Sequence, residues 1–246
     1  MSRSSDLSRR LQRRLACHQA LHDPEREPRN QLRWLGELRR WQAQRLERSF
    51  RRLLEDSRQG PAIRFFLSDV YGDHDFSRRD ADIARVIPMM QRLLPTSLLE
   101  TVACGIELGA LSQAFDLRMA QALQDMASGR KRLDDVLYAG AYRRVGLPRL
   151  RARQIDLIRD VGNGLASALR LPGVSMLLRL SRGPAEAAGL GELQGFLERG
   201  VAAFTRLGDV SAFLDEIERS ERTASRRLFA GEPDPFAVGQ EKRSSR

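Results

Sequence analysis

The chain has almost no segment in which polar and apolar residues alternate with a period of two, the pattern of a half-buried strand. Instead, clusters of Pro and Gly divide it into segments of helical length, whose apolar residues recur every three or four positions. Because a repeat of 3.6 residues places such positions on one face of a helix, the pattern predicts an all-α protein. We expect a multi-helix bundle of about nine to ten helices around a long central helix.

Breaks at Pro and Gly set the expected boundaries. The central helix is expected to begin with a capping box at Ser97 and Glu100, and it is apolar on two opposite faces in its first half. We expect a basic N-terminal helix and linker over 1–28, a single bundle domain over 29–230 and a disordered tail over 231–246. The predicted helices cover residues 7–21, 29–56, 61–70, 77–88, 97–128, 133–145, 148–171, 174–181, 190–207 and 210–229.

Apolar runs and cysteines indicate the compartment. Glu107 interrupts the most apolar run, so we expect no membrane span, and the charged N-terminus lacks the apolar stretch of a secretory signal. Cys17 and Cys104 are the only cysteines and lie far apart, which favours reduced thiols in the cytoplasm. Phosphate-loop and dinucleotide motifs are missing from the sequence, and we expect no cofactor.

The positive charge is concentrated near the N-terminus. The formal net charge is +10, and residues 1–58 hold 15 Arg against 8 Asp and Glu. Such a basic surface suits an acidic protein partner, nucleic acid or anionic lipid. Trp34 and Trp41, with Arg45 and Arg48 near them, form a candidate interaction face, because aromatic rings among Arg suit base stacking or a partner groove. Packing of both indoles into the bundle is expected ahead of such a role.

Carboxylates supply two further candidates. Glu100 and Glu107 lie two turns apart on one face of the central helix, and a structural ion pair between Glu107 and an Arg is expected ahead of a metal role. His74 and Asp75 are further metal candidates in a segment with five Asp. Read as a twelve-residue calcium loop from Asp69 to Asp80, this segment does not fit, because the sixth position is His74 instead of Gly and the twelfth is Asp80 instead of Glu. It is a candidate structural or functional corner, comprising Arg64, Asp69, Tyr71, Asp75, Arg79 and Asp80.

The same segment is part of a pattern that resembles a known protein family. The string from Phe65 to Asp80 reads FFLxDVYGxxDFxxRD, and the runs 153–158 and 193–200 accompany it. Together they resemble a family of uncharacterised bacterial proteins, a domain of unknown function, over about residues 30–220. The resemblance implies no activity, cofactor or catalytic residue.

Three functions remain open from the sequence. The leading one is a non-catalytic helical interaction or regulatory protein that uses a basic N-terminal face, because abundant helix faces accompany no assembled catalytic set. The first alternative is a bundle that holds a metal or small ligand near the acidic segment. The second is nucleic-acid binding through the helix that carries Arg and Trp, which predicts an affinity that falls steeply with salt.

Overall fold

The computed structural model describes residues 3–70, 85–86, 95–127, 129–171 and 173–237. Within those residues the chain forms eleven α-helices and no strand, which confirms the all-α prediction. Short 3-10 and π segments, η1 (Pro28–Gln31) and η2 (Phe66–Val70), connect some of them. The helices are α1 (Arg3–His22), α2 (Arg33–Ser49), α3 (Arg51–Glu55), α4 (Gly60–Phe65), α6 (Thr96–Met126), α7 (Asp135–Val145), α8 (Pro148–Leu169), α9 (Val174–Leu180), α10 (Arg182–Ala187), α11 (Gly191–Thr205) and α12 (Val210–Ala230).

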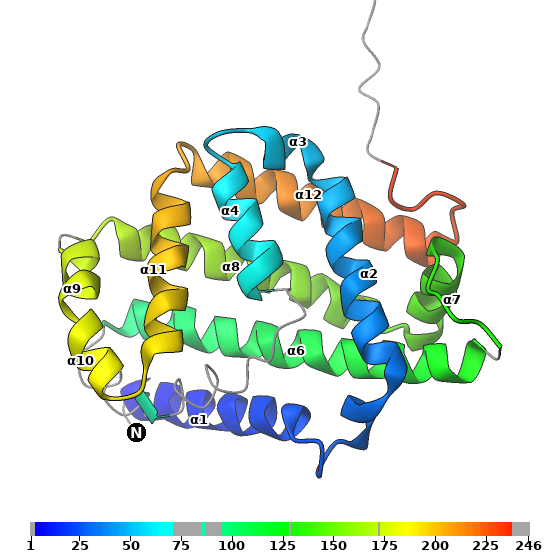
Figure 1. Ribbon diagram of the computed structural model, residues 1–246, viewed down its shortest axis with the longest axis horizontal. Coiled ribbons are helices and arrows are strands. Elements are labelled where there is room, and N and C mark those ends of the chain that lie inside the picture. The colour runs from blue at the N-terminus through cyan, green and yellow to red at the C-terminus, as the bar shows by residue number, and fades with distance from the viewer. Residues whose placement is uncertain (1–2, 71–84, 87–94, 128, 172, 238–246) are drawn as a thin grey trace, which may run out of the picture.

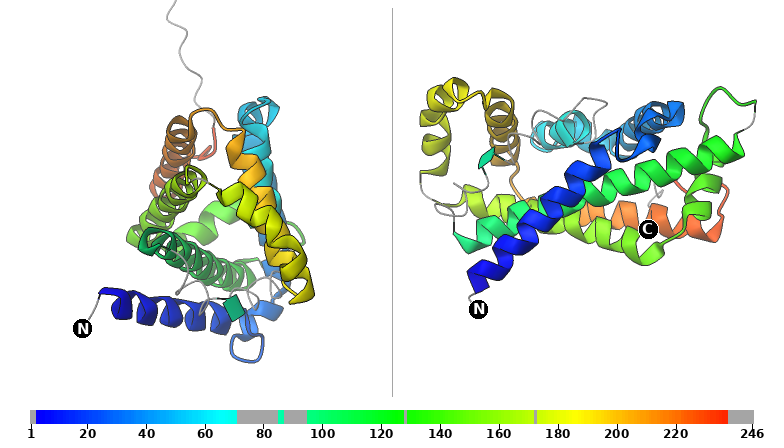
Figure 2. Two further views of the ribbon diagram at one scale, coloured as in Figure 1. Left: turned by 90° about the vertical axis from the view of Figure 1, so that its left-hand side faces the viewer. Right: turned by 90° about the horizontal axis from the view of Figure 1, so that it is seen from below.

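The helices form two layers that cross each other. In Figure 1, α1, α6, α8 and α12 run across the view, and α2, α4 and α11 cross in front of them. The end-on view in Figure 2 shows the two layers side by side, with α1 at the lower edge. Buried apolar side chains fill the space between the layers in two main clusters, one around Trp34, Trp41 and Leu117 and the other around Phe50, Phe204 and Phe213.

The long helix α6 lies at the centre, as predicted. It contacts α1, α2, α7 and α8, and its side chains Leu117, Met119 and Leu123 are fully buried. By length and composition α6 could also cross a membrane, but a single such helix is weak evidence, since core helices of globular proteins pass the same test. The predicted capping box is wrong: Pro95 is the N-cap, no side chain caps the helix, and Ser97 already lies inside it.

The segment predicted as one helix over 29–56 is divided. It contains η1, α2 and α3, and the break falls at Phe50, whose backbone leaves the helical conformation (φ −109°, ψ 21°). The ring of Phe50 is buried in the second cluster, together with Leu46 and Leu53. Packing across the two layers therefore overrides the helical propensity of a continuous segment.

Helix α1 packs on the bundle. Leu7 and Leu11 are buried, and the ring of His18 lies so close to α6 that a Cβ atom on Gly109 would stand 3.0 Å from its Cε1. Gly109 permits this close approach, whereas Gly105 faces open space.

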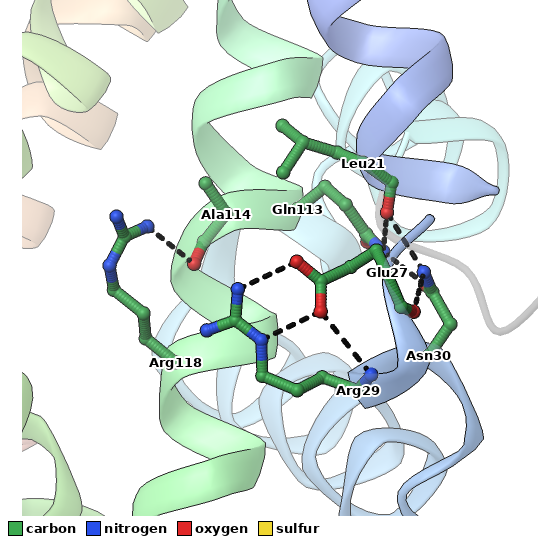
Figure 3. Close-up of polar contacts among 7 residues, drawn as sticks. All are labelled: Leu21, Glu27, Arg29, Asn30, Gln113, Ala114 and Arg118. Atoms are coloured by element: carbon green, nitrogen blue, oxygen red, sulfur yellow. Dashed lines mark hydrogen bonds and ion pairs between the residues drawn. The ribbon is translucent and has the colours of Figure 1, made fainter. Parts of the chain in front are cut away.

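A buried glutamine ties the end of α1 to α2 and α6. Gln113 on α6 donates to the Asn30 side chain (2.7 Å) and to the Leu21 carbonyl (3.3 Å), and accepts from Arg39 (2.6 Å). Figure 3 shows Asn30 donating in turn to the Leu21 carbonyl, next to the bidentate ion pair of Glu27 and Arg29. Because a buried amide is costly unless its hydrogen bonds are made, this network fixes the connection between α1 and α2.

The residues after α12 correct the expectation of a tail disordered from Gly231 onward. Gly231 ends the helix in the left-handed conformation (φ 73°), and the chain then folds back to bury Pro235 and to pack Phe236 against the first cluster. Pro235 and Phe236, together with contacts to Arg227, thus attach residues 232–237 to the rest of the fold.

Candidate functional site

The candidate interaction face is mostly buried. Trp34, Trp41 and Arg45 are 2%, 6% and 8% exposed, and the Trp41 ring stacks on Tyr138 with 4.0 Å between centroids. Arg45 forms a bidentate ion pair with Glu221. Both indoles are therefore buried and offer no exposed face for base stacking, which argues against an exposed interaction face and supports the packing of both rings into the bundle. Arg48 alone of the four is exposed.

The metal candidates are not brought together. Glu100 is exposed, whereas Glu107 lies between α1 and α8, in ion pairs with Arg14 and with Arg153 (3.1 Å). The predicted ion pair of Glu107 is thereby confirmed. Among the residues that the structure describes, no group of three His, Cys, Asp or Glu side chains could hold a metal. His74 and Asp75 lie outside the described residues.

Most of the candidate corner also lies outside the described part of the chain. This applies to Tyr71, Asp75, Arg79 and Asp80, while Asp69 is placed only as a backbone position in η2. Arg64 is described: it extends from α4 and donates to the Leu54 carbonyl (3.2 Å).

Arg48 and Arg64, which came from two different candidate sets, meet in one surface hollow. It lies where α4 and η2 pass α2 and α3 (Figure 1), and its volume is about 600 Å³. We call it the basic hollow, because three of its side chains are arginines and one is a glutamate. Its lining residues are Glu47, Arg48, Arg51, Leu54, Arg64, Leu67 and Ser68.

The arginines of the basic hollow are only weakly engaged. Arg48 lies 3.7 Å from Asp135 and Arg51 lies 3.0 Å from Glu55, and both arginine side chains are more than half exposed. Exposed pairs of this kind contribute about 0–1 kcal/mol, so an incoming anion can replace them at little cost. Leu54 and Leu67 pack against the second core cluster and give the hollow an apolar base.

Gly60 positions the third arginine. A Cβ atom on this glycine would stand 2.6 Å from the Leu54 carbonyl oxygen, and 3.1 and 3.2 Å from the two terminal nitrogens of Arg64. Only a residue without a side chain lets Arg64 reach across to Leu54. The predicted helix over 61–70 begins next to Gly60, but the role of Gly60 beside Arg64 depends on a contact between separate helices.

The sequence pattern did not indicate that Arg151 is buried. Arg151 on α8 is 6% exposed, and its guanidinium lies 3.6 Å from the centroid of the Phe115 ring and 4.5 Å from that of Tyr142. Nearby, burial raises the pKa of the Asp116 carboxyl, an effect that Arg39 opposes. The aromatic rings on α6 and α7 hold Arg151 by cation–π contacts, which fix α8 against both helices.

Comparison with known proteins identifies a family without a described activity. Neither the curated proteins nor the solved structures contain a significant match to this chain. One family profile, described as a domain of unknown function (DUF8198), matches residues 21–235. This range begins at the end of α1 and ends at Pro235, next to Phe236. The chain therefore belongs to the DUF8198 family.

Proposed function

We propose that this chain is a non-catalytic helical interaction protein, and that it binds an acidic segment of a protein partner in the basic hollow. The observation that carries the proposal is the convergence of Arg48, Arg51 and Arg64 over an apolar base. Three guanidinium groups offer charge-assisted hydrogen bonds to carboxylates, while Leu54 and Leu67 offer contact to apolar side chains between them.

The two alternatives have less support. Nucleic-acid binding was based on exposed Trp rings, and both rings are buried. Metal binding was based on carboxylates, of which Glu107 is already neutralised by two arginines. We also propose that the protein is bacterial and acts in the cytoplasm, on the basis of the sequence resemblance and of two cysteines that form no disulfide.

The test is the affinity for a fluorescein-labelled peptide of alternating Glu and Leu, followed by fluorescence anisotropy. The variant Arg48→Glu/Arg51→Glu should bind at least about tenfold more weakly than the parent, since a hydrogen bond to a charged group is worth about 1.5–3 kcal/mol. The matched variant Arg10→Glu/Arg13→Glu makes the same change in net charge on α1, where both side chains are exposed. It should retain nearly the parent affinity.

Equal losses in the two variants would mean that the peptide responds to net charge alone and would refute the basic hollow as the site. A single-stranded oligonucleotide serves as the competing probe. If it binds in a salt-dependent manner while the acidic peptide does not bind, the nucleic-acid alternative replaces the proposal.

Gly60→Ala provides a separate check on Arg64. The added methyl group would press on the Leu54 carbonyl oxygen (2.6 Å) and on the Arg64 guanidinium (3.1 Å), so it would separate the two without changing any charge. We expect weaker peptide binding in this variant, whereas a peptide affinity equal to that of the parent would exclude Arg64 from the site.

A further inference from the structure

The residues that follow α12 form a short tail with its own binding surface. The tail comprises residues 232–237, and its surface, here called the tail seat, comprises Trp41, Arg45 and Tyr138. The Phe236 ring lies 5.6 Å from the Trp41 ring and 5.9 Å from the Tyr138 ring, between centroids. The Arg45 guanidinium lies over the same ring at 5.4 Å. Phe236 is thus held by two aromatic rings and a cation.

The tail seat is held in place by contacts that do not involve the tail. Trp41 and Tyr138 stack on each other, and Glu221 holds Arg45 in a bidentate ion pair. All three side chains come from rigid helices, α2 and α7, and Figure 1 shows the tail as the red segment beside them and α12. A preorganised surface of this kind binds a ligand at low cost in conformational entropy.

The tail itself resembles a bound peptide more than a part of the fold. Gly231 ends α12, and the sequence Glu-Pro-Asp-Pro-Phe-Ala that follows forms no helix. Besides the packing of Pro235 and Phe236, the tail contacts Arg227 at three points: the Glu232 N–H donates to the Arg227 carbonyl (3.0 Å), the Glu232 carboxylate lies 3.5 Å from the Arg227 guanidinium, and the Ala237 carbonyl accepts from it (2.7 Å). Two prolines restrict its backbone, and the Ala237 N–H donates to the Asp234 carbonyl (3.4 Å) across a turn at Pro235 and Phe236.

From these contacts we infer that the tail seat is a recognition site for a short, turn-forming segment of a partner protein that carries Phe directly after Pro. The chain's own tail occupies the seat in cis and competes with the partner. Because a tethered ligand acts at an effective concentration in the millimolar range, the partner segment binds the intact chain more weakly than a chain whose own Phe is removed. This inference does not depend on the basic hollow.

The experiment uses a labelled peptide with the sequence of residues 231–237 and full-length receptors. Phe236→Ala, which vacates the seat, should bind the peptide at least about tenfold more tightly than the unmodified chain. The matched variant Phe229→Ala removes another ring that packs on the same core cluster but does not lie in the tail seat. It should bind no more tightly than the unmodified chain. A peptide with Ala in place of Phe tests the requirement for the ring.

Saturable binding by Phe236→Ala, lost with the Ala peptide and accompanied by a change in Trp fluorescence, supports the inference. No binding by a Phe236→Ala protein that keeps its helical circular dichroism overturns it, as does equal binding of the two peptides. If Phe236→Ala does not fold, the test is made on the unmodified chain. Excess Phe peptide must then bind and change the Trp fluorescence of the protein, whereas the Ala peptide must not. A failure of either condition overturns the inference.

Discussion

Gly164 on α8 lies against Thr101 on α6, and a methyl group at this position should push the two helices apart. An ideal Cβ there would stand 2.1 Å from Oγ1, 2.5 Å from Cγ2 and 2.8 Å from Cβ of Thr101. Thr101 cannot rotate away from all three contacts, because its Cβ is fixed by the backbone and its hydroxyl donates to the Ser97 carbonyl (3.0 Å). The two helices must therefore move apart.

The expected cost follows from two opposing effects. Overpacking of this severity lowers the free energy of unfolding by about 3 kcal/mol, while replacing Gly by Ala inside a helix raises it by about 1 kcal/mol. Gly164→Ala should therefore lower the free energy of unfolding by about 2 kcal/mol and the Tm by about 4–8 °C for a chain of this size. Gly105→Ala, in a helix position that faces open space, should instead raise the Tm by about 2–4 °C.

Thermal melts followed by circular dichroism measure both variants. In a double-mutant cycle, Thr101→Ala removes two of the three close atoms, so it should recover at least about 1 kcal/mol of the Gly164→Ala loss. A Gly164→Ala protein as stable as the parent, or a cycle with no coupling, would refute the close packing of α6 and α8.

Two further predictions concern charge and capping. Hydrogen bonds donated by Arg159 and Arg222 lower the pKa of Glu218 below its ordinary value of 4.5, so Glu218 stabilises the fold above that pH and loses this effect as the pH falls through its lowered pKa. Glu218→Gln should therefore melt below the parent at pH 7, with a difference that disappears on acidification; a pH-independent difference would contradict the ion pairs. The side chain of Asp134 caps α7, so Asp134→Ala should lower the free energy of unfolding by about 1 kcal/mol. The neighbouring substitution Asp135→Ala should lower it by less. Equal melts of the two variants would count against the cap.

Most of the helices could be predicted because their signals are local. Pro and Gly mark the ends, and the apolar period identifies the buried face, as at Leu35, Leu38 and Leu46, all of which are buried. The break at Phe50 and the tail contact of Phe236 could not be predicted in this way. Both depend on where an aromatic ring finds its partners in another layer, which no local pattern encodes.

For the candidate site, too, the local signals could be predicted and the contacts between distant residues could not. The excess of Arg near the N-terminus was visible in the sequence, but Trp34 and Trp41 among those Arg could be read either as a surface or as core. The choice depends on Tyr138 and Phe236, which are far away in the sequence. The basic hollow joins α2, α3 and α4, and its third arginine depends on Gly60, whose close contacts appear only once the helices are placed.

The most direct test of the central claim observes the arginines of the basic hollow themselves. In nuclear magnetic resonance spectra of the full chain, the Hε–Nε signals of Arg48, Arg51 and Arg64 can be assigned by single substitution to Lys and followed as the acidic peptide is added. We predict saturable shifts of these three signals, while those of Arg10 and Arg13 on α1 stay in place. Shifts confined to α1, or no saturable shift in the basic hollow, would contradict the proposal.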